Sequence, residues 1–192
     1  MKKGIKLAFL AVVLLGVCWF AGQKMKAARL ARLDEPVNQE ADVWSLLGHM
    51  DSDKVSLEGR KEDSDYPYGY NVGAIEDEQV GKAILLTPDT AIEWEGILSE
   101  DASLTIDFFL HPWVADGSDG ALLSVAVISG GTVHDYVYEV SANLQNETIS
   151  LEEFSGEVQI KLTVVNEEGR NKDCDWVILT QCFLSAGAFR EE

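Results

Sequence analysis

The chain has 192 residues, with 33 Asp and Glu against 15 Lys and Arg and a net charge of −18 at pH 7. This length has room for one ordinary domain and a short additional segment. Every acidic residue follows Leu33, where eight Lys and Arg remain against all 33, so residues 33–192 carry a net charge of −25. A surface of that charge repels nucleic acid, which excludes nucleic-acid binding as a function class.

The first 23 residues predict a membrane helix. Residues 7–23 contain no charged side chain and follow the basic start MKKGIK. As a helix they span about 25 Å, the lower limit for crossing the hydrocarbon core of a bilayer. A cleaved signal peptide and an uncleaved signal anchor both fit. We favour the anchor, because Trp19 and Phe20 crowd the small residues that a cleavage site needs.

Residues 24–50 are predicted to form a juxtamembrane stalk with a short helix. Basic residues flank the apolar segment on both sides, so charge alone leaves its orientation open. The stub before the segment is too short to be a domain, and the rest has the composition of an exported bacterial module. We therefore expect a single-pass protein of the cell membrane whose C-terminal domain is extracytoplasmic, with secretion after signal cleavage as the alternative. Within the stalk, Val43, Trp44, Leu47 and Met50 fall at helical spacing and predict one or two turns of amphipathic helix.

From Val55 onward the pattern is that of strands. Apolar residues alternate with period two at Leu104, Ile106, Phe108 and Leu110, and clusters of Gly, Asn, Asp and Ser separate the apolar runs. The spacing of about ten residues, with no segment of helix length, predicts an all-β sandwich of about eight to nine strands over residues 51–188. The predicted strands are KAILLT, AIEW, SLTIDFFL, ALLSVAVIS, TVHDYVYEV, EVQIKLTVV and DWVILTQCFL.

Three short motifs near the C-terminus carry a resemblance to a known family. They are Phe154-Ser155-Gly156, the turn from Gly169 to Asn171, and Asp175-Trp176. With the segment SDGALLSVAV they resemble the galactose-binding-like jelly rolls found among carbohydrate-binding modules. The resemblance covers residues 51–186 or so. It implies a jelly-roll fold and a glycan as the ligand.

The loop HPWVADGSDG precedes the apolar strand ALLSVAV and combines His, Trp and Asp with glycine. Asp119 can hydrogen-bond its own backbone, and Gly120 can take a positive φ. We therefore interpret Ser118-Asp119-Gly120 as a turn that leads into the strand.

Aromatic residues on two loops form the candidate ligand surface. Loop aromatics give flat, rigid surfaces that suit stacking on a sugar ring. A sandwich gathers its loops at two ends, so loops far apart in sequence can share one rim. Capping of the sandwich end is the alternative role for these side chains. Trp94 and Trp176 are instead predicted to lie on strands in the core. His134, on the same side of its strand as Tyr136 and Tyr138, is predicted to pack across strands. The candidate ligand residues are Tyr66, Tyr68, Tyr70, His111, Trp113 and Asp116.

The sequence offers little support for catalysis or for a metal. None of the three His residues has metal-ligand spacing, and no phosphate-binding loop or nucleophile elbow occurs. Cys174 and Cys182 are predicted to stay unpaired, because one strand holds them too far apart for a disulfide. The family resemblance implies calcium as an optional ligand, with hard oxygen donors at Asp53, Glu58, Asp173 and Asp175.

We therefore expect a membrane-anchored, extracytoplasmic, non-catalytic module that binds a cell-surface or environmental glycan. The alternative is an interaction or accessory subunit of a membrane or cell-envelope assembly that binds no sugar. An enzyme has the weakest support.

Overall fold

The computed structural model of the protein describes residues 43–60, 71–98, 101–154, 156–165 and 173–185. The chain divides into two compact units, Met1–Pro36 and Val37–Glu192. The predicted membrane anchor, residues 1–23, lies outside the described residues. Within the described part of the chain, no helix is long and apolar enough to span a membrane.

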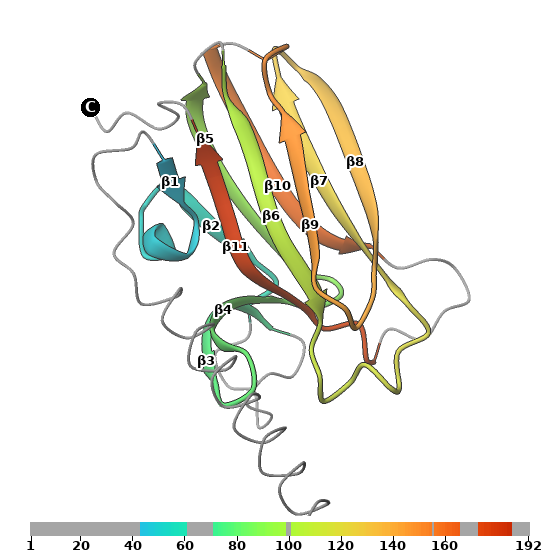
Figure 1. Ribbon diagram of the computed structural model, residues 1–192. Helices are drawn as coiled ribbons and strands as arrows, with labels where there is room; N and C mark the ends of the chain where they lie inside the picture. Colours follow the sequence, from blue (N-terminus) through green and yellow to red (C-terminus); the bar gives the residue numbers. More distant parts are fainter. Residues whose placement is uncertain (1–42, 61–70, 99–100, 155, 166–172, 186–192) are drawn as a thin grey trace, which may run out of the picture. The chain divides into compact units, whose positions relative to one another are not determined.

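The described residues form a β-sandwich of two antiparallel sheets (Figure 1). Sheet A has the strand order β3-β4-β11-β6-β9, and β1 also pairs with β11. Sheet B has the order β2-β5-β10-β7-β8. The strands are β1 (Val43–Ser45), β2 (Val55–Glu58), β3 (Val72–Asp77), β4 (Gly81–Leu86), β5 (Ala91–Leu98), β6 (Ser103–Leu110), β7 (Ala121–Ser129), β8 (Thr132–Val140), β9 (Gln145–Ser150), β10 (Gly156–Val165) and β11 (Val177–Ser185), and a 3-10 helix, η1, covers Leu47–His49.

The strand order is that of a jelly roll. Strands β4 to β11 alternate between the sheets as β4-β11-β6-β9 and β5-β10-β7-β8, which is the order that two Greek keys produce. The predicted all-β sandwich is thus confirmed. The structure adds β1, β2 and β3 to these eight strands, so the described residues hold eleven strands rather than eight or nine.

The main core lies between the sheets and follows from the period-two pattern. On β6, Leu104, Ile106, Phe108 and Leu110 are all buried in it. Strand β7 is an interior strand of sheet B, paired with β10 on one side and β8 on the other, and its inward residues Leu123, Val125 and Val127 are buried in this core. Burial of this apolar surface is the main force that holds the two sheets together.

The segment before the sandwich corrects one prediction. The helical spacing of Val43, Trp44, Leu47 and Met50 predicted an amphipathic helix, but Val43–Ser45 pairs as strand β1 with the end of β11. Only Leu47–His49 is helical, as a single 3-10 turn. Pairing with β11 and burial against the core outweigh a periodicity that is only eight residues long.

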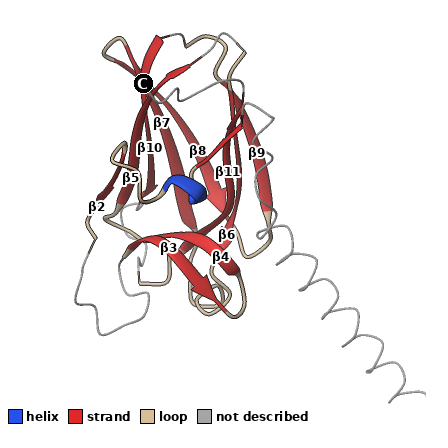
Figure 2. Ribbon diagram, turned by 90° about the vertical axis from the view of Figure 1, so that its left-hand side faces the viewer, coloured by secondary structure: helices blue, strands red, loops and turns tan. Residues whose placement is uncertain are grey.

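A second, smaller core lies on the outer face of sheet A. Phe109 and Ile178 alternate with residues of the main core, so they point to the opposite side of the sheet. The β3–β4 hairpin covers them with Val80, Ala83 and Leu85. Figure 2 shows β3 and β4 crossing the lower part of the sandwich. This hairpin brings its turn, with Asp77, to the loop that follows β6.

Candidate functional site

The start of β3 and the end of β6 lie at one end of the sandwich. Strand register places Val72, Leu86, Val177 and Leu110 in a single row across sheet A. Asn71, directly before β3, and residues 111–120, directly after β6, therefore lie at the same end. The predicted residues Tyr66, Tyr68 and Tyr70 lie outside the described residues, so their meeting with Trp113 stays a prediction.

The loop after β6 is held by its own backbone hydrogen bonds. The His111 N–H donates to the Trp176 carbonyl at 2.8 Å, which ties the start of the loop to the start of β11. The amides of Val114 and Ala115 donate to the His111 carbonyl at 3.0 and 3.1 Å. The next amides along, at Gly117 and at residue 118, donate to the Val114 carbonyl at 2.9 and 3.1 Å. The loop is therefore a compact, ordered turn.

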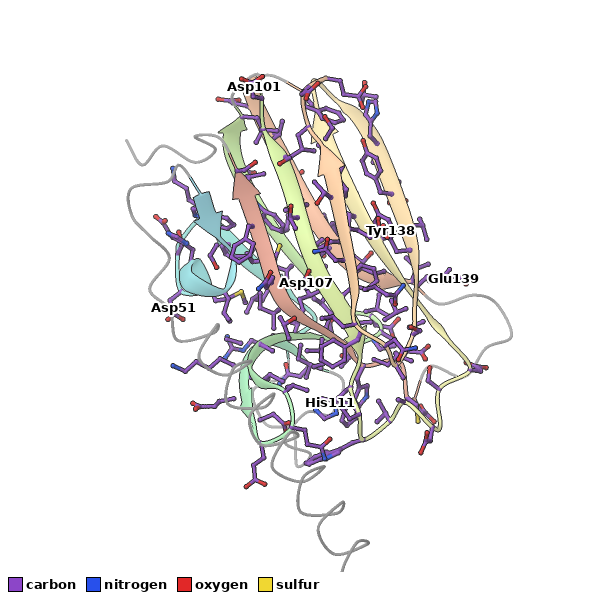
Figure 3. All side chains as sticks on the ribbon, in the orientation of Figure 1. Asp51, Asp101, Asp107, His111, Tyr138 and Glu139 are labelled. Atoms are coloured by element: carbon purple, nitrogen blue, oxygen red, sulfur yellow. The ribbon has the colours of Figure 1, made fainter. Side chains whose placement is uncertain are left out.

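His111 lies beneath this loop with its side chain 0% exposed (Figure 3). Its Nδ1 accepts the Trp113 N–H at 3.2 Å, which places the proton of the neutral ring on Nε2. Nε2 lies 3.9 Å from Oδ1 of Asp77. Burial lowers the pKa of His111 and outweighs the opposing attraction of the Asp77 carboxylate. His111 is therefore a neutral imidazole that links the loop to the β3–β4 hairpin.

Asp77 is fixed by the hairpin turn that it caps. Its Oδ1 accepts the backbone N–H groups of Gln79 and Val80 at 2.7 and 3.1 Å. The sequence analysis missed Asp77, because 34 positions separate it from His111 and no local motif links the two. Only the folding of the hairpin onto the outer face of sheet A brings them together.

Trp113 is the exposed aromatic side chain of the loop. Its ring meets His111 edge to face at a centroid distance of 5.4 Å, and Trp176 meets His111 in the same way at 6.0 Å. Trp113 nevertheless remains 56% exposed. Its ring therefore offers an accessible surface on a well-supported base. Asp116, on the same loop, is also exposed.

The structure does not place His111 at the ligand edge, where the sequence analysis had put it. The buried ring cannot reach the hydroxyl groups of a ligand on the surface. Its place in the candidate site is that of a positioning residue beneath Trp113. Trp113 and Asp116 are the described members of the predicted set that solvent can reach.

The end of the loop is a turn, as the sequence indicated. The Ser118 hydroxyl donates to Oδ1 of the buried Asp175 at 2.7 Å and accepts the Gly120 N–H at 3.1 Å. Gly120 has a φ of 105°, which a residue with a side chain rarely adopts. The Asp175-Trp176 pair thus supports the candidate loop from below.

The four predicted calcium donors do not form one site. Glu58 receives an ion pair from Lys161 at 2.7 Å, on sheet B. Asp175 is buried and accepts the Ser118 hydroxyl. Asp53 and Asp173 are exposed in turns. Among the residues that the structure describes, no group of three or more His, Cys, Asp or Glu side chains is arranged to hold a metal ion.

The remaining predictions for individual side chains are largely confirmed. Trp94 is buried in the main core, whereas Trp176 is only half-buried against the second core. His134 packs edge to face on Phe154 at 4.8 Å, and Tyr138 contacts Phe108 at 5.8 Å. Cys174 and Cys182 are both free thiols, as predicted.

No protein-family model matches the chain, and no curated protein does. Solved structures with similar folds include a CBM61 module in complex with β-1,4-galactotriose, at 14% identity, a TM-score of 0.48 and coverage of 77% of this chain and 94% of that one. The xylan-binding module CBM15 is 8% identical, with a TM-score of 0.43 and coverage of 77% and 98%. A family two carbohydrate esterase from Cellvibrio japonicus is 11% identical, with a TM-score of 0.46 and coverage of 77% and 34%.

Carbohydrate-binding modules are thus among the similar structures, and this chain spans about a third of the length of the esterase. Galactotriose and xylan are ligands of those proteins. The fold of this chain is established by its own strand order.

Proposed function

We propose that this protein is a non-catalytic glycan-binding module and that Trp113 is its main stacking surface. The observation that carries the proposal is a large aromatic ring, 56% exposed, on a loop held by five backbone hydrogen bonds and by the buried His111. Ordering a mobile side chain on binding costs conformational entropy. The ordered loop and the His111 ring that contacts Trp113 reduce that cost.

The chemistry of the loop fits a sugar. The Trp113 face can stack on the apolar face of a pyranose, and the Asp116 carboxylate can accept hydrogen bonds from hydroxyl groups at its edge. Tyr66, Tyr68 and Tyr70 remain candidates for further stacking from the neighbouring loop. One or two stacked rings at about 1 kcal/mol each give weak binding, at high-micromolar dissociation constants or above, unless a multivalent glycan adds avidity.

The test is a glycan array followed by calorimetry on the best ligand, with Trp113→Ala against the matched control Leu144→Ala. Leu144 is 53% exposed and lies in the turn between β8 and β9, which is tied to the end of β6 by the Leu110 N–H to Ser141 carbonyl bond. The control therefore removes a similarly exposed apolar side chain from a neighbouring loop at the same end of the sandwich. We expect Trp113→Ala to abolish sugar binding with a nearly unchanged melting temperature, and Leu144→Ala to retain it. Equal binding by both variants, or unfolding of Trp113→Ala, would contradict the proposal.

A second candidate function is docking to a partner in a membrane or cell-envelope assembly, without sugar binding. The observation in its favour is the exposure of Val133 and Val137 on β8, at 59% and 51%. Large exposed apolar side chains on one strand are a feature of protein interfaces. The absence of binding to any glycan on the array would favour this function over the first.

We also propose that the sandwich is extracytoplasmic and stays attached to the cell membrane through residues 1–23. The proposal rests on the uncharged segment 7–23 and on the acidic composition that follows it. Protease added to intact, wall-stripped cells is expected to remove the sandwich from the cell surface. A sandwich that stays fully protected in those cells, and is digested only after lysis, would contradict this placement.

A further inference from the structure

Strand β8 forms one edge of sheet B. Among the described strands it pairs only with β7, through nine consecutive residue pairs from Ser129↔Thr132 to Ala121↔Val140 with no bulge. The connecting turn, Gly130-Gly131, has φ values of 55° and 80°, as the tight turn of a two-residue hairpin requires. This turn fixes the register, so β8 presents a regular outer edge from Val133 to Val137. At the far end of the strand, the Glu139 carbonyl already accepts a side-chain N–H of Gln145 at 2.7 Å. Such an edge is a template for a further strand.

The two faces of β8 carry different side chains, and these side chains determine which residues an added strand would need on each of its own faces. The outward side chains, all exposed, are Val133, Asp135, Val137 and Glu139. A strand next to β8 would place every second side chain beside this apolar and acidic row. Apolar side chains on the added strand would cover the two valines.

The other face of β8 carries half-buried aromatic rings with carboxylates beside them. Tyr136 and Tyr138 point towards the interior, where both pack against the main core. The Tyr136 hydroxyl donates to Glu153 at 3.5 Å. Glu147 of β9 acts electrostatically on Tyr138 and, together with burial, raises the pKa of that tyrosine. Aromatic faces beside carboxylates recognise cationic groups.

No basic side chain of this region competes for those carboxylates. Residues 83–160 contain 14 Asp and Glu and no Lys or Arg. Lys161, the next cation along the chain, is already paired with Glu58 and Glu93 at 2.7 and 3.4 Å. Among the described residues, the edge therefore has a negative charge that favours a cationic ligand.

We propose that β8 binds an extended peptide segment of a partner protein by strand addition, and that basic and apolar residues alternate in this segment. Backbone hydrogen bonds to β8 hold the segment. Its Lys or Arg side chains lie towards Tyr136, Tyr138, Glu147 and Glu153, and its apolar side chains lie beside Val133 and Val137.

A second copy of this chain does not fit the same edge. Pairing of two β8 strands would bring Asp135 and Glu139 of both copies together, and like charges on adjacent strands are destabilising. The acidic edge thus disfavours self-association while it admits a basic strand. This inference does not depend on Trp113 or on glycan binding.

The test uses the full chain and a nine-residue synthetic peptide that alternates Lys and Val, labelled for fluorescence anisotropy. A peptide that alternates Glu and Val is the control for β-propensity. We expect saturable binding of the Lys-Val peptide that weakens with salt, and no binding of the Glu-Val peptide. Hydrogen exchange is expected to slow at alternate amides of β8, the ones on its free edge, when the Lys-Val peptide binds.

A matched pair of charge reversals locates the site. Glu153→Lys reverses a carboxylate that lies beside Tyr136, where the basic side chains of the segment are placed, whereas Asp51→Lys makes the same charge change in an exposed turn on the opposite side of the sandwich from β8 (Figure 3). We expect Glu153→Lys to weaken peptide binding about fivefold and Asp51→Lys less than about twofold. The proposal is overturned if the peptide does not bind, if both variants weaken binding equally, or if β8 gains no protection.

Discussion

His111 offers a direct test of how burial and charge compete in this protein. Burial lowers its pKa from the ordinary value of 6.5, and the Asp77 carboxylate, 3.9 Å from Nε2, acts in the opposite direction. Protonation would also turn Nδ1 into a donor facing the Trp113 N–H, so the bond between them would be lost. We therefore expect the folded protein to resist protonation of His111.

The sign and size of the effect follow from linkage. Because the folded-state pKa lies below 6.5, the unfolded chain binds the proton first as the pH falls, and acid favours unfolding. The loss of stability begins near pH 6.5 and stops below the folded-state pKa. Between pH 7.5 and 5.5 it amounts to at most about 1.4 kcal/mol for this one group.

The assay compares urea denaturation of the wild type and of His111→Gln at pH 7.5, 6.5 and 5.5. The glutamine cannot titrate, while every other ionisable group is the same in both proteins. We expect the wild type to be the more stable at pH 7.5 and to lose part of that advantage by pH 5.5, within the limit given above. An advantage that stays constant, or grows towards acid, would show that Asp77 dominates and would refute the reasoning.

Two further predictions concern the residues around the candidate loop and β11. Burial raises the pKa of Cys182 to about 12, so iodoacetamide at pH 8 should leave this thiol unmodified in the folded protein and label it in urea. Peptide mass mapping measures the labelling, and modification of Cys182 in the folded protein would contradict its burial. Ser118→Ala removes the hydrogen bond to the buried Asp175 and should lower the free energy of unfolding, measured by urea denaturation, by about 1–2 kcal/mol. An unchanged denaturation midpoint would mean that this bond does not stabilise the turn.

The sequence by itself determined the class of fold and much of the core. The alternation at Leu104, Ile106, Phe108 and Leu110 predicts the strand and its inward side together. The burial of Phe109 on the outer face of the same strand was not predicted, because it depends on contacts with the β3–β4 hairpin. The turn at Ser118 to Gly120 was equally readable from Gly120, because a positive φ is a local requirement that favours glycine. The Ser118 hydroxyl that accepts the Gly120 N–H was not part of that prediction. Such local requirements act over a few residues, so they can be predicted without knowing which strands pair.

Strand pairing and the environment of each side chain were decided only in the tertiary structure. Val43–Ser45 has the spacing of a helix and becomes a strand because the end of β11 pairs with it. His111 looked like a ligand residue on an exposed loop, yet the β3–β4 hairpin buries it against Asp77. The alternation of β8 was visible in the sequence, but its place at the edge of sheet B was not. Each of these outcomes depends on contacts between segments far apart in the chain, which no local pattern records.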